Sequence, residues 1–375
     1  MRRIALNLLF LVPGETGGME IHARRLIAAL ATARPDIEWL AIVSREAADL
    51  DLGPNVRLLR TSVSARSRPR RILAEQTLLP RLVRRYGAEL LHSLGASAPV
   101  RATGVQVVTI HDVIYARAPQ AHTPVARTAR RVIVPAAARA ADRVITVSGA
   151  ARDDIVAELG VPTDRIDVVH NGPGLPRSPT SPVCEVRERF GLGTAPFVLS
   201  ASGRRPHKNL TRLLEAMARV NAGDEPLLVL PGYPTAFEDD LVQRARVLRI
   251  DHRVRILSWV SDADLNGLYQ AAAVFAFPSL AEGFGMPVLE AMSRDLPVAC
   301  ANVPALREVA GDAARYFNPL EVNDIASAIN TLLDDCIARE TLIAAGRKRA
   351  QCFTWERAAR GTLESYERAL AQKLA

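Results

Sequence analysis

The sequence has few cysteines and nothing that suggests a disulfide or metal framework. Among 375 residues there are four, at Cys184, Cys300, Cys336 and Cys352. Their spacing matches no paired metal-ligand motif, and secreted disulfide scaffolds are much richer in cysteine. We therefore interpret all four as reduced thiols and expect a cytoplasmic protein.

Long hydrophobic runs are also missing. No stretch approaches the roughly 18 apolar residues that a membrane-spanning helix needs. The first apolar run, Ile4–Val12, follows Arg2 and Arg3 and so imitates a signal peptide. Asn7 interrupts this short run, and no small-residue cleavage site follows it. We predict that Ile4–Val12 is the first buried strand rather than a signal peptide.

Lysine is scarce, with only Lys208, Lys348 and Lys373, so arginine carries nearly all the positive charge. The formal net charge is +8, and the excess lies in the first half, where residues 1–180 hold 25 arginines against 16 acidic residues. Aromatic residues make up only 5% of the chain, and no nucleic-acid-binding motif is present. We therefore do not expect a nucleic-acid partner.

The length and the pattern predict two α/β domains, because 375 residues exceed one typical core. Short apolar runs alternate with helical segments, which is typical of doubly wound parallel sheets. Four prolines between Pro173 and Pro182 predict an extended linker. The predicted division is an N-terminal domain at 1–172, a Pro-rich linker at 173–195, a second domain at 196–354, and a C-terminal helix at 355–375.

A strand-loop-helix pattern that begins at Val274–Phe277 organises the rest of the chain. The loop ends in two glycines, the second being Gly285, and Pro287 suits the first position of a helix. Glycines before a helix N-terminus let backbone N–H groups approach a phosphate. Glu282 and Glu290 border the same place, and carboxylates accept hydrogen bonds from hydroxyl groups. A nucleotide sugar has both kinds of group.

The segment P-S-L-A-E-G-F-G-M-P-V-L-E-A-M, from Pro278 to Met292, resembles the signature of the retaining glycosyltransferases of family 4. The resemblance implies the GT-B fold, with two doubly wound Rossmann-like domains facing across a cleft. It places the acceptor on the first domain and a nucleotide diphosphate sugar on the second. It also implies that Glu282 holds hydroxyls of the transferred sugar and Glu290 the ribose. The donor diphosphate is expected at Phe284, Gly285 and Met286.

Two segments of the first half resemble further parts of the family pattern. Gly17 and Gly18 match a glycine pair that lies beside the donor phosphates and the acceptor, although a tight turn without a ligand explains them equally well on their own. His111 and Asp112 follow a predicted strand at Val105–Ile110, where open α/β sheets bind ligands. The resemblance implies that His111 faces the transferred sugar and that Asp112 orients it or holds the loop.

The second half carries the expected diphosphate cations. Gly203 to Asn209 has the family form G-R-x-x-x-K-N, so Arg204 and Lys208 are predicted to converge on the donor diphosphate. Val260 begins a segment that resembles the loop beside the nucleotide base, where main-chain groups would read the base.

Residues 57–85 hold nine arginines, among them Arg70, Arg71, Arg84 and Arg85, and a single acidic residue, Glu75. Apolar residues are interleaved with them. The pattern fits a helix on the acceptor side that lies on an anionic membrane surface. It fits a core-packed helix with a solvated basic face equally well, and the sequence leaves both open.

The resemblance implies transfer of a hexose with retention of the anomeric configuration, in polysaccharide or glycoconjugate synthesis. Our first hypothesis is mannose from GDP-mannose, moved to a saccharide acceptor such as a polyprenyl-diphosphate-linked one at the cytoplasmic face of the membrane. No cofactor or metal is expected, because positive side chains and the helix start would stabilise the leaving diphosphate. The alternatives are a nucleotide-sugar epimerase or hydrolase of the same fold, and a non-catalytic basic module that binds membranes.

Overall fold

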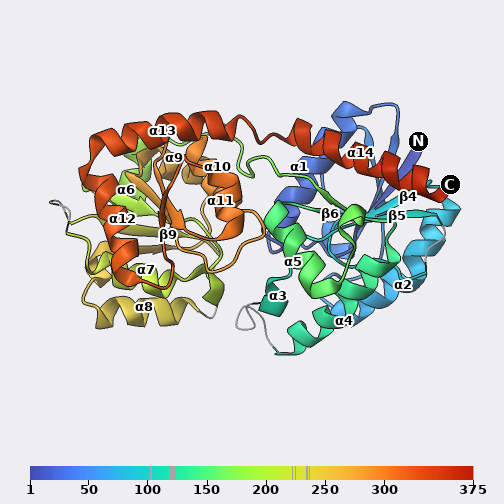
Figure 1. Ribbon diagram of the computed structural model, residues 1–375, viewed down its shortest axis with the longest axis horizontal. Helices are drawn as coiled ribbons and strands as arrows, with labels where there is room; N and C mark the ends of the chain where they lie inside the picture. The colour runs from blue at the N-terminus through green and yellow to red at the C-terminus, as the bar shows by residue number, and fades with distance from the viewer. Residues whose placement is uncertain are drawn as a thin grey trace. The chain divides into compact units, whose positions relative to one another are not determined.

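The computed structural model describes residues 1–101, 104–117, 124–221, 223, 225–233, 235 and 237–374. The chain forms two compact units (Figure 1). Unit 1 comprises Met1–Gly172 and Thr354–Ala375, and unit 2 comprises Pro173–Phe353. The chain therefore passes from one unit to the other twice, first after Gly172 and again before Thr354.

Unit 1 is built on a seven-stranded sheet in which all neighbouring strands are parallel. Its strands are β1 (Arg3–Leu8), β2 (Glu38–Val43), β3 (Val56–Arg60), β4 (Leu90–Ser93), β5 (Val105–Thr109), β6 (Arg143–Thr146) and β7 (Ile166–Val168). The spatial order is β3-β2-β1-β4-β5-β6-β7. The direction of winding therefore reverses between β1 and β4, where α/β sheets of this kind bind ligands.

Helices cover both faces of this sheet. They are α1 (Gly18–Ala33), α2 (Arg68–Arg85), α3 (Ile114–Arg117), α4 (Pro124–Ala140), α5 (Gly149–Leu159) and α14 (Trp355–Leu374). Alternate residues of β1 serve opposite faces: Ile4 and Leu6 pack in the cluster of α1 and α14, while Ala5 packs in the cluster of α2. Ser148 caps α5, because its hydroxyl accepts the N–H of Ala151 at 3.0 Å.

The first strand is shorter than predicted. β1 ends at Leu8, and the remaining residues up to Val12 form a buried turn instead of a strand. Asn7 explains the end, since its side-chain oxygen accepts the backbone N–H of Leu9 at 3.2 Å and turns the chain. Apolar residues continue through the turn because it is buried, so hydrophobicity alone could not mark the boundary.

The C-terminal helix α14 belongs to unit 1 and lies against α1 (Figure 1). Tyr366 on α14 lies with its hydroxyl 2.7 Å from His92 Nδ1, in the middle of the sheet. Ser365 donates to the carboxylate of Asp167 at 2.6 Å, and Arg143 pairs with the same carboxylate. Buried polar contacts as well as apolar packing therefore hold the end of the chain on unit 1.

Unit 2 contains a six-stranded parallel sheet in the order β10-β9-β8-β11-β12-β13. Its strands are β8 (Phe197–Leu199), β9 (Leu227–Pro231), β10 (Val254–Leu257), β11 (Val274–Phe277), β12 (Val298–Ala301) and β13 (Arg315–Phe317). Its helices are α6 (Val183–Arg189), α7 (Leu210–Met217), α8 (Glu238–Val247), α9 (Asp262–Ala271), α10 (Met286–Met292), α11 (Pro304–Ala310), α12 (Val322–Asp334) and α13 (Cys336–Ala350). Here the winding reverses between β8 and β11.

The segment 173–195 is only partly the extended linker that its prolines suggested. Val183–Arg189 forms α6, which packs against α9. Ser181 also belongs to unit 2, because its hydroxyl donates to Asp264 at 2.8 Å. None of the helices in the described residues is both long enough and apolar enough to cross a membrane.

Candidate active site

The loop between β11 and α10 has the geometry that its two glycines suggested. Gly285 precedes the helix with a φ of 106°, a conformation that side chains disfavour. A Cβ atom there would also lie 2.5 Å from Leu306 Cδ2. Pro287 is the second residue of α10, where its missing N–H is not needed. The backbone at Gly285 can therefore take this path only with glycine.

Lys208 and Glu282 meet in this loop region. The ammonium nitrogen of Lys208 lies 2.6 Å from Glu282 Oε1, and the two side chains are only 16% and 9% exposed. Lys208 also lies over the ring of Phe277, with its nitrogen 5.2 Å from the centroid. The two residues that were predicted to bind the diphosphate and the sugar are thus direct partners.

Backbone and amide contacts join the loops that follow β8 and β11, at the reversal point of the sheet. The N–H of Leu280 donates to the carbonyl of His207 at 2.8 Å. The Asn209 amide donates to the carbonyls of Pro278 at 3.1 Å and Pro319 at 2.7 Å. Lys208 lies between His207 and Asn209, so its backbone is held on both sides.

Glu290 is buried on α10 and has two protein partners. Its Oε1 accepts the N–H of Leu175 at 2.9 Å, and its Oε2 accepts the hydroxyl of Tyr269 at 3.0 Å. Arg294 completes the cluster by donating to the carbonyls of Leu175 and Pro176 at 3.0 Å. Glu290 therefore anchors the start of unit 2, a role that the sequence did not suggest. Its predicted contact with ribose stays a prediction.

Arg204 does not converge with Lys208 in this structure, and its predicted contact with the donor diphosphate stays a prediction. The Arg204 side chain is fully buried. It pairs with Glu238 at 2.6 Å and donates to the carbonyls of Leu230 and Leu257. Burial lowers the pKa of this guanidinium. Arg204 thus joins the ends of β9 and β10 to α8, and its charge is compensated inside the protein.

Val260 lies in the loop between β10 and α9, beside an exposed aromatic pair that the sequence reading missed. Trp259 is 65% exposed, and its ring centroid lies 5.1 Å from that of Tyr233. Tyr233 follows β9 and Trp259 follows β10, so both lie at the carboxyl edge of the sheet, as Lys208 does after β8. A large exposed aromatic surface at this edge suits a planar ring of a ligand.

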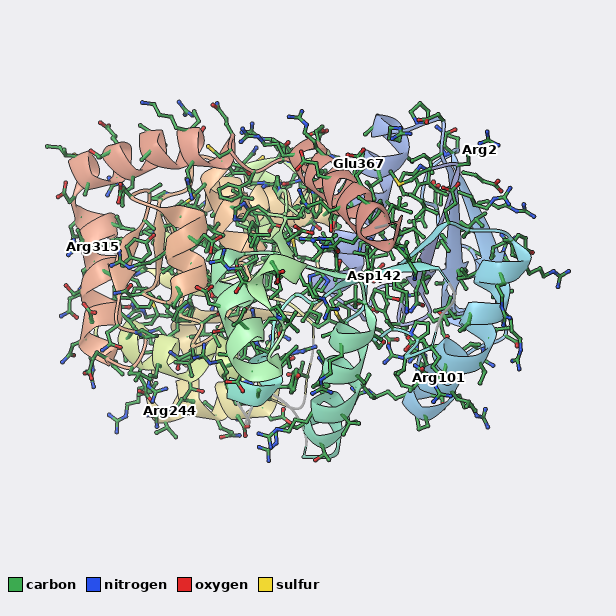
Figure 2. The ribbon with its side chains drawn as sticks, turned by 45° about the vertical axis from the view of Figure 1, so that its right-hand side comes forward. Arg2, Arg101, Asp142, Arg244, Arg315 and Glu367 are labelled. Atoms are coloured by element: carbon green, nitrogen blue, oxygen red, sulfur yellow. The ribbon has the colours of Figure 1, made fainter. Side chains whose placement is uncertain are left out.

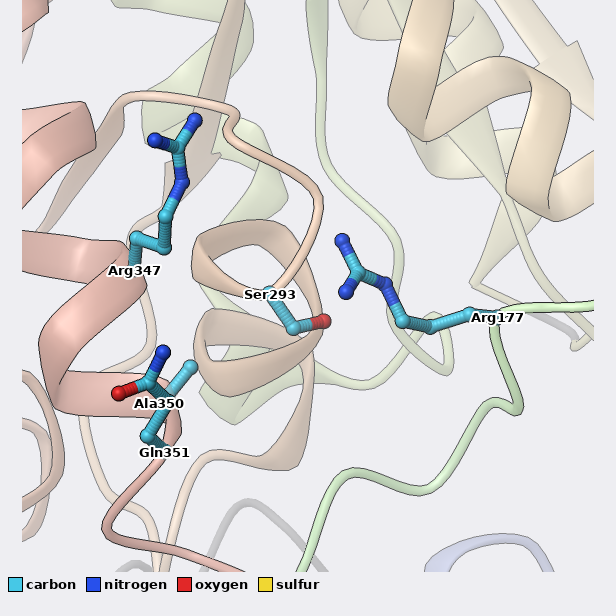
Figure 3. A pocket seen from close by; sticks show the side chains of 5 residues that line it. All are labelled: Arg177, Ser293, Arg347, Ala350 and Gln351. Atoms are coloured by element: carbon cyan, nitrogen blue, oxygen red, sulfur yellow. The ribbon is translucent and has the colours of Figure 1, made fainter.

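A cavity of about 270 Å³ lies at the carboxyl end of α10, opposite the Gly285 loop (Figure 3). It is lined by Arg177, Ser293, Arg347, Ala350 and Gln351. Arg347 is paired with Asp295 at 2.9 Å. The carboxyl ends of α10 and α13 border the cavity, and positive side chains are favourable at such ends. The arginines are therefore explained by the helix ends, and none of the predicted donor residues lines this cavity.

In unit 1, Gly17 and Gly18 lie where β1 turns into α1. Gly17 has a φ of 65° and precedes the helix, while Gly18 is its first residue. Glu20 fixes the turn, because its Oε2 accepts the N–H of Gly14 at 2.8 Å. Arg24 donates to the other oxygen of Glu20 at 2.9 Å. Glu20 lies three residues after Gly17, and a glutamate at this distance from the start of a helix could have marked the anchor in the sequence.

His111 and Asp112 follow β5, as predicted. The imidazole Nε2 of His111 lies 3.3 Å from the carbonyl of Leu94, and burial lowers the pKa of the ring. Asp112 accepts the N–H of Ile114 at 3.0 Å, so it holds the loop before α3. His22 contacts His111 from α1, with ring centroids 4.5 Å apart. The sequence analysis did not single out His22, although a polar residue on the apolar face of α1 is a signal.

The arginine-rich segment contains α2, whose apolar side packs on the sheet. Leu79 and Val83 are buried there, while Arg70, Arg84 and Arg85 are exposed. Arg71 lies instead on the inner side, 3.9 Å from Glu75. Arg71 therefore does not share the exposed surface of Arg70, Arg84 and Arg85, and its predicted place on the acceptor or membrane side stays a prediction.

Glu75 is completely buried and accepts a hydrogen bond from Ser97 at 3.0 Å. Burial raises the pKa of this carboxyl group. Arg71 lies beside Glu75 because a buried carboxylate favours a cation nearby. Arg101 extends the exposed basic surface: it follows Val100, whose N–H donates to Gln76 of α2 (Figure 2).

The comparisons with known proteins now bear on this geometry. Residues 16–173 match the family described as Glycosyltransferase Family 4, and residues 185–349 match Glycosyl transferases group 1. The chain is 30% identical over 368 residues to O-antigen chain mannosyltransferase B of Escherichia coli, which covers 93% of this chain and 96% of that protein. The chain belongs to glycosyltransferase family 4. As a family 4 member it is a retaining glycosyltransferase, and the sequence prediction of the enzyme class is confirmed.

The chain is also similar to a further mannosyltransferase and to solved structures that share its fold. O-antigen chain mannosyltransferase RfbU of Salmonella typhimurium is 27% identical over 236 residues, 62% of this chain and 63% of that protein. Sucrose-phosphate synthase of Thermosynechococcus elongatus aligns with a TM-score of 0.81 at 22% identity, over 99% of this family 4 chain and 100% of that structure. The structure of Anabaena Alr3699/HepE with UDP-glucose aligns with a TM-score of 0.75 at 23% identity, over 97% of this chain and 100% of that structure. The GT-B fold that the sequence predicted is confirmed.

The described part of this glycosyltransferase contains no group of three or more His, Cys, Asp or Glu side chains that could hold a metal ion. Lys208 places a cationic side chain at the junction of the loops that follow β8 and β11, whereas Arg204 is turned inward.

Proposed function

We propose that this glycosyltransferase moves mannose from GDP-mannose to a saccharide acceptor, with retention, during assembly of a lipid-linked polysaccharide. The observation that carries the proposal is the Lys208–Glu282 pair at the reversal point of the unit 2 sheet. It puts a cation suited to a diphosphate beside a carboxylate suited to sugar hydroxyls. The choice of mannose is supported by relatives named as O-antigen mannosyltransferases.

The proposal gives each part of the donor its own residues. Lys208 and the backbone at Phe284, Gly285 and Met286 bind the diphosphate. Glu282 binds hydroxyls of the mannose. Glu290 binds the ribose, and the base lies beside Val260 and Trp259. In unit 1, His111 and Asp112 act at the transferred sugar, and the turn at Gly17 and Gly18 lies close to the phosphates and the acceptor.

In the proposed reaction, the bond between the anomeric carbon and the phosphate oxygen breaks as an acceptor hydroxyl oxygen bonds to the same face. The acceptor proton passes to the departing phosphate, so no protein nucleophile is needed. Lys208 and the N–H groups at Gly285 and Met286 stabilise the negative charge that develops on the diphosphate. Because these groups supply the positive field, we propose that the reaction needs no metal ion.

We also propose that the enzyme works at the cytoplasmic membrane face through the exposed arginines of α2. The apolar side of α2 packs on the sheet, so its outer surface can act only by charge and by single exposed side chains such as Leu73. Each arginine near an anionic surface contributes about 1 kcal/mol. Attraction of this kind would bring the enzyme to a polyprenyl-diphosphate-linked acceptor.

Thermal-shift measurement with GDP-mannose, UDP-glucose, UDP-N-acetylglucosamine and dTDP-rhamnose, without metal, tests the donor. A ligand at about a hundred times its Kd stabilises the folded state by about 2.7 kcal/mol, which raises the Tm by several degrees. The proposal predicts a shift with GDP-mannose and smaller shifts with the others. If only one of the other nucleotide sugars shifts the Tm, its sugar would take the place of mannose in the proposal. If none of the four nucleotide sugars shifts the Tm, the proposed activity is contradicted.

A further inference from the structure

His22 is a buried histidine that the proposed reaction does not use. It lies on α1, one turn after the Gly17–Gly18 turn, and is 2% exposed. Its neighbours on this face of α1, Ala23 and Leu26, are apolar. An imidazole in such a place is costly unless its polar atoms have partners. The contacts of His22 therefore need an explanation.

The tautomer of His22 follows from its hydrogen bond. Nδ1 lies 2.8 Å from the side-chain oxygen of Asn171, and an amide oxygen only accepts, so Nδ1 carries the proton. Burial and the nearby ring of His111 lower the pKa of His22 and keep it neutral. Nε2 is then an unprotonated acceptor, and it has no partner within the described residues. Within the described residues, the hydrogen bond to Asn171 is therefore the polar contact that orients the His22 ring.

The other side of the His22 ring meets His111. The ring centroids are 4.5 Å apart, and the planes are nearly perpendicular at 87°. His111 has one further anchor, the 3.3 Å contact of its Nε2 with the carbonyl of Leu94. That contact is longer than an ordinary hydrogen bond, so it holds the ring weakly. Packing against His22 is therefore a restraint on the orientation of His111 that a weak hydrogen bond alone would not supply.

Asn171 and Trp355 connect this pair to the places where the chain passes between the units. The ring of Trp355 lies 5.9 Å from that of His22. It also covers Gly172, where a Cβ atom would lie 2.7 Å from the indole. Asn171 and Gly172 are the last residues before the first passage, and Trp355 follows the second. His22 therefore contacts His111 on one side. On the other side it contacts Asn171 and Trp355, which lie beside the two points where the chain passes between the units.

We propose that His22, itself held by its hydrogen bond to Asn171, is a positioning residue that sets the orientation of the His111 ring and so keeps His111 Nε2 at the carbonyl of Leu94. The catalytic consequence rests on the proposed function, because it requires His111 to act at the transferred sugar. The geometric claim does not, since it concerns residues of unit 1 alone. His22 has no substrate contact in this account and acts only through His111.

The first test follows the imidazole nitrogens of the protein labelled with 15N-histidine, by long-range 1H–15N correlation without substrate. The wild type should show His22 protonated at Nδ1 and His111 protonated at Nε2. In Asn171→Ala and His22→Phe, the His111 nitrogens should move toward the averaged shifts of two exchanging tautomers. The variant Tyr366→Phe, which removes a buried hydrogen bond to His92, is the matched control and should leave the His111 nitrogens in place.

Unchanged His111 nitrogens in both folded variants would overturn the proposal. A second variant separates the two contacts of His22: His22→Asn keeps a donor for Asn171 but lacks the ring that packs on His111, so it should disturb His111 as much as His22→Phe does. His111 shifts that remain native in His22→Asn would also overturn it.

The kinetic test compares consumption of the donor by the same variants. Misplacement of His111 should lower kcat by roughly tenfold or more, with the donor KM changed less than about twofold. A merely structural His22 would lower the Tm and leave the kcat of the folded enzyme unchanged, as expected for Tyr366→Phe. If the wild type turns over no nucleotide sugar, the proposed function fails while the nitrogen shifts still decide the position of His111.

Discussion

The ammonium nitrogen of Lys208 and the carboxylate oxygen Oε1 of Glu282 are 2.6 Å apart, in a loop junction where both side chains are largely buried. Each residue therefore neutralises the other in this structure. A diphosphate that binds at Lys208 must compete with Glu282 for the ammonium group. Binding of the phosphates would thereby release the carboxylate toward the sugar.

Removing the charge of Glu282 should separate binding from turnover. Glu282→Gln is expected to raise the affinity for GDP by about three- to tenfold, because Lys208 loses its competing anion. The same variant should lower the turnover of donor by at least about a hundredfold, since the sugar hydroxyls lose a charged acceptor. Calorimetry with GDP and a turnover assay measure the two effects.

Lys208→Met should have the opposite effect on binding and lower the affinity for GDP by about tenfold or more. Glu238→Gln is the matched control, because Glu238 pairs with the inward-turned Arg204 at 2.6 Å. It should lower stability without changing GDP affinity. Equal GDP affinity in Lys208→Met and the wild type would contradict the diphosphate role of Lys208.

Trp259 should report nucleotide binding by its fluorescence. Of the three tryptophans, Trp39 is fully buried and Trp259 is 65% exposed. We expect GDP to quench the emission and pyrophosphate, which has no base, to leave it unchanged. Trp259→Phe should abolish the quenching, and Trp259→Ala should weaken GDP by about ten- to a hundredfold, the usual effect of losing one stacked base. Quenching that persists in Trp259→Phe would exclude the stacking role.

The anchoring and ribose roles of Glu290 can be told apart. Glu290→Ala leaves the Leu175 N–H and the Tyr269 hydroxyl without their partner, so stability should fall by about 1–3 kcal/mol. Tyr269→Phe removes one of these bonds and should cost about 1 kcal/mol. Only Glu290→Ala should reduce the preference for GDP over 2′,3′-dideoxy-GDP. If Glu290→Ala keeps the preference for GDP over 2′,3′-dideoxy-GDP, Glu290 does not bind the ribose and serves only as an anchor.

Buried neutral histidines should make unit 1 sensitive to mild acid. Burial lowers the pKa of His92 to about 3, and the pKa values of His22 and His111 are also lowered from 6.5. Below pH 6.5 the unfolded chain binds protons that the folded chain does not. As the pH decreases below 6.5, the free energy of unfolding should therefore decrease by up to about 1.4 kcal/mol per pH unit for each histidine.

Urea denaturation at pH 7.5, 6.5 and 5.5 measures this slope. His92→Gln is expected to lower the free energy of unfolding at pH 7.5. It should also make the dependence of that free energy on pH less steep, by the contribution of about one proton. The exposed His252, replaced by Asn, serves as the control and should change neither. Parallel pH profiles for the wild type and His92→Gln would show that His92 is not the group that titrates.

The basic face of α2 should bind anionic vesicles. Arg70→Gln with Arg84→Gln should reduce flotation with vesicles that contain phosphatidylglycerol. The same loss of two charges in unit 2, Arg246→Gln with Lys348→Gln, should have little effect, since both control residues are merely exposed. Equal binding of the wild type to anionic and neutral vesicles would mean that the arginines of α2 are only solvated.

The sequence predicted features that are set by local chemistry. β11 spans the predicted residues Val274–Phe277, and Gly285 and Pro287 mark the start of α10, because a left-handed residue and a missing N–H act within a few residues. The inward direction of Arg204 was not predicted because its partners come from far away in the chain: Glu238 and the carbonyls of Leu230 and Leu257. No local pattern could show that its side chain turns inward.

His22 illustrates the same limit in unit 1. It lies on the apolar face of α1, where a polar residue is itself a signal, but its partner Asn171 is 149 positions away. Arg71 follows the same logic, since only the fold shows that it lies beside the buried Glu75 while Arg70 is exposed. Residue types were readable from the sequence, whereas the direction of each side chain depended on packing.

Retaining transfer from GDP-mannose can be followed through the anomeric protons by 1H NMR, while the enzyme consumes GDP-mannose with methyl α-mannoside as trial acceptor. We expect that GDP-mannose is consumed without added metal, that the first sugar product carries the α-configuration of the donor, and that Glu282→Gln slows the appearance of this product. A first product with the β-configuration, or no consumption of GDP-mannose by the folded enzyme, would contradict the proposed reaction.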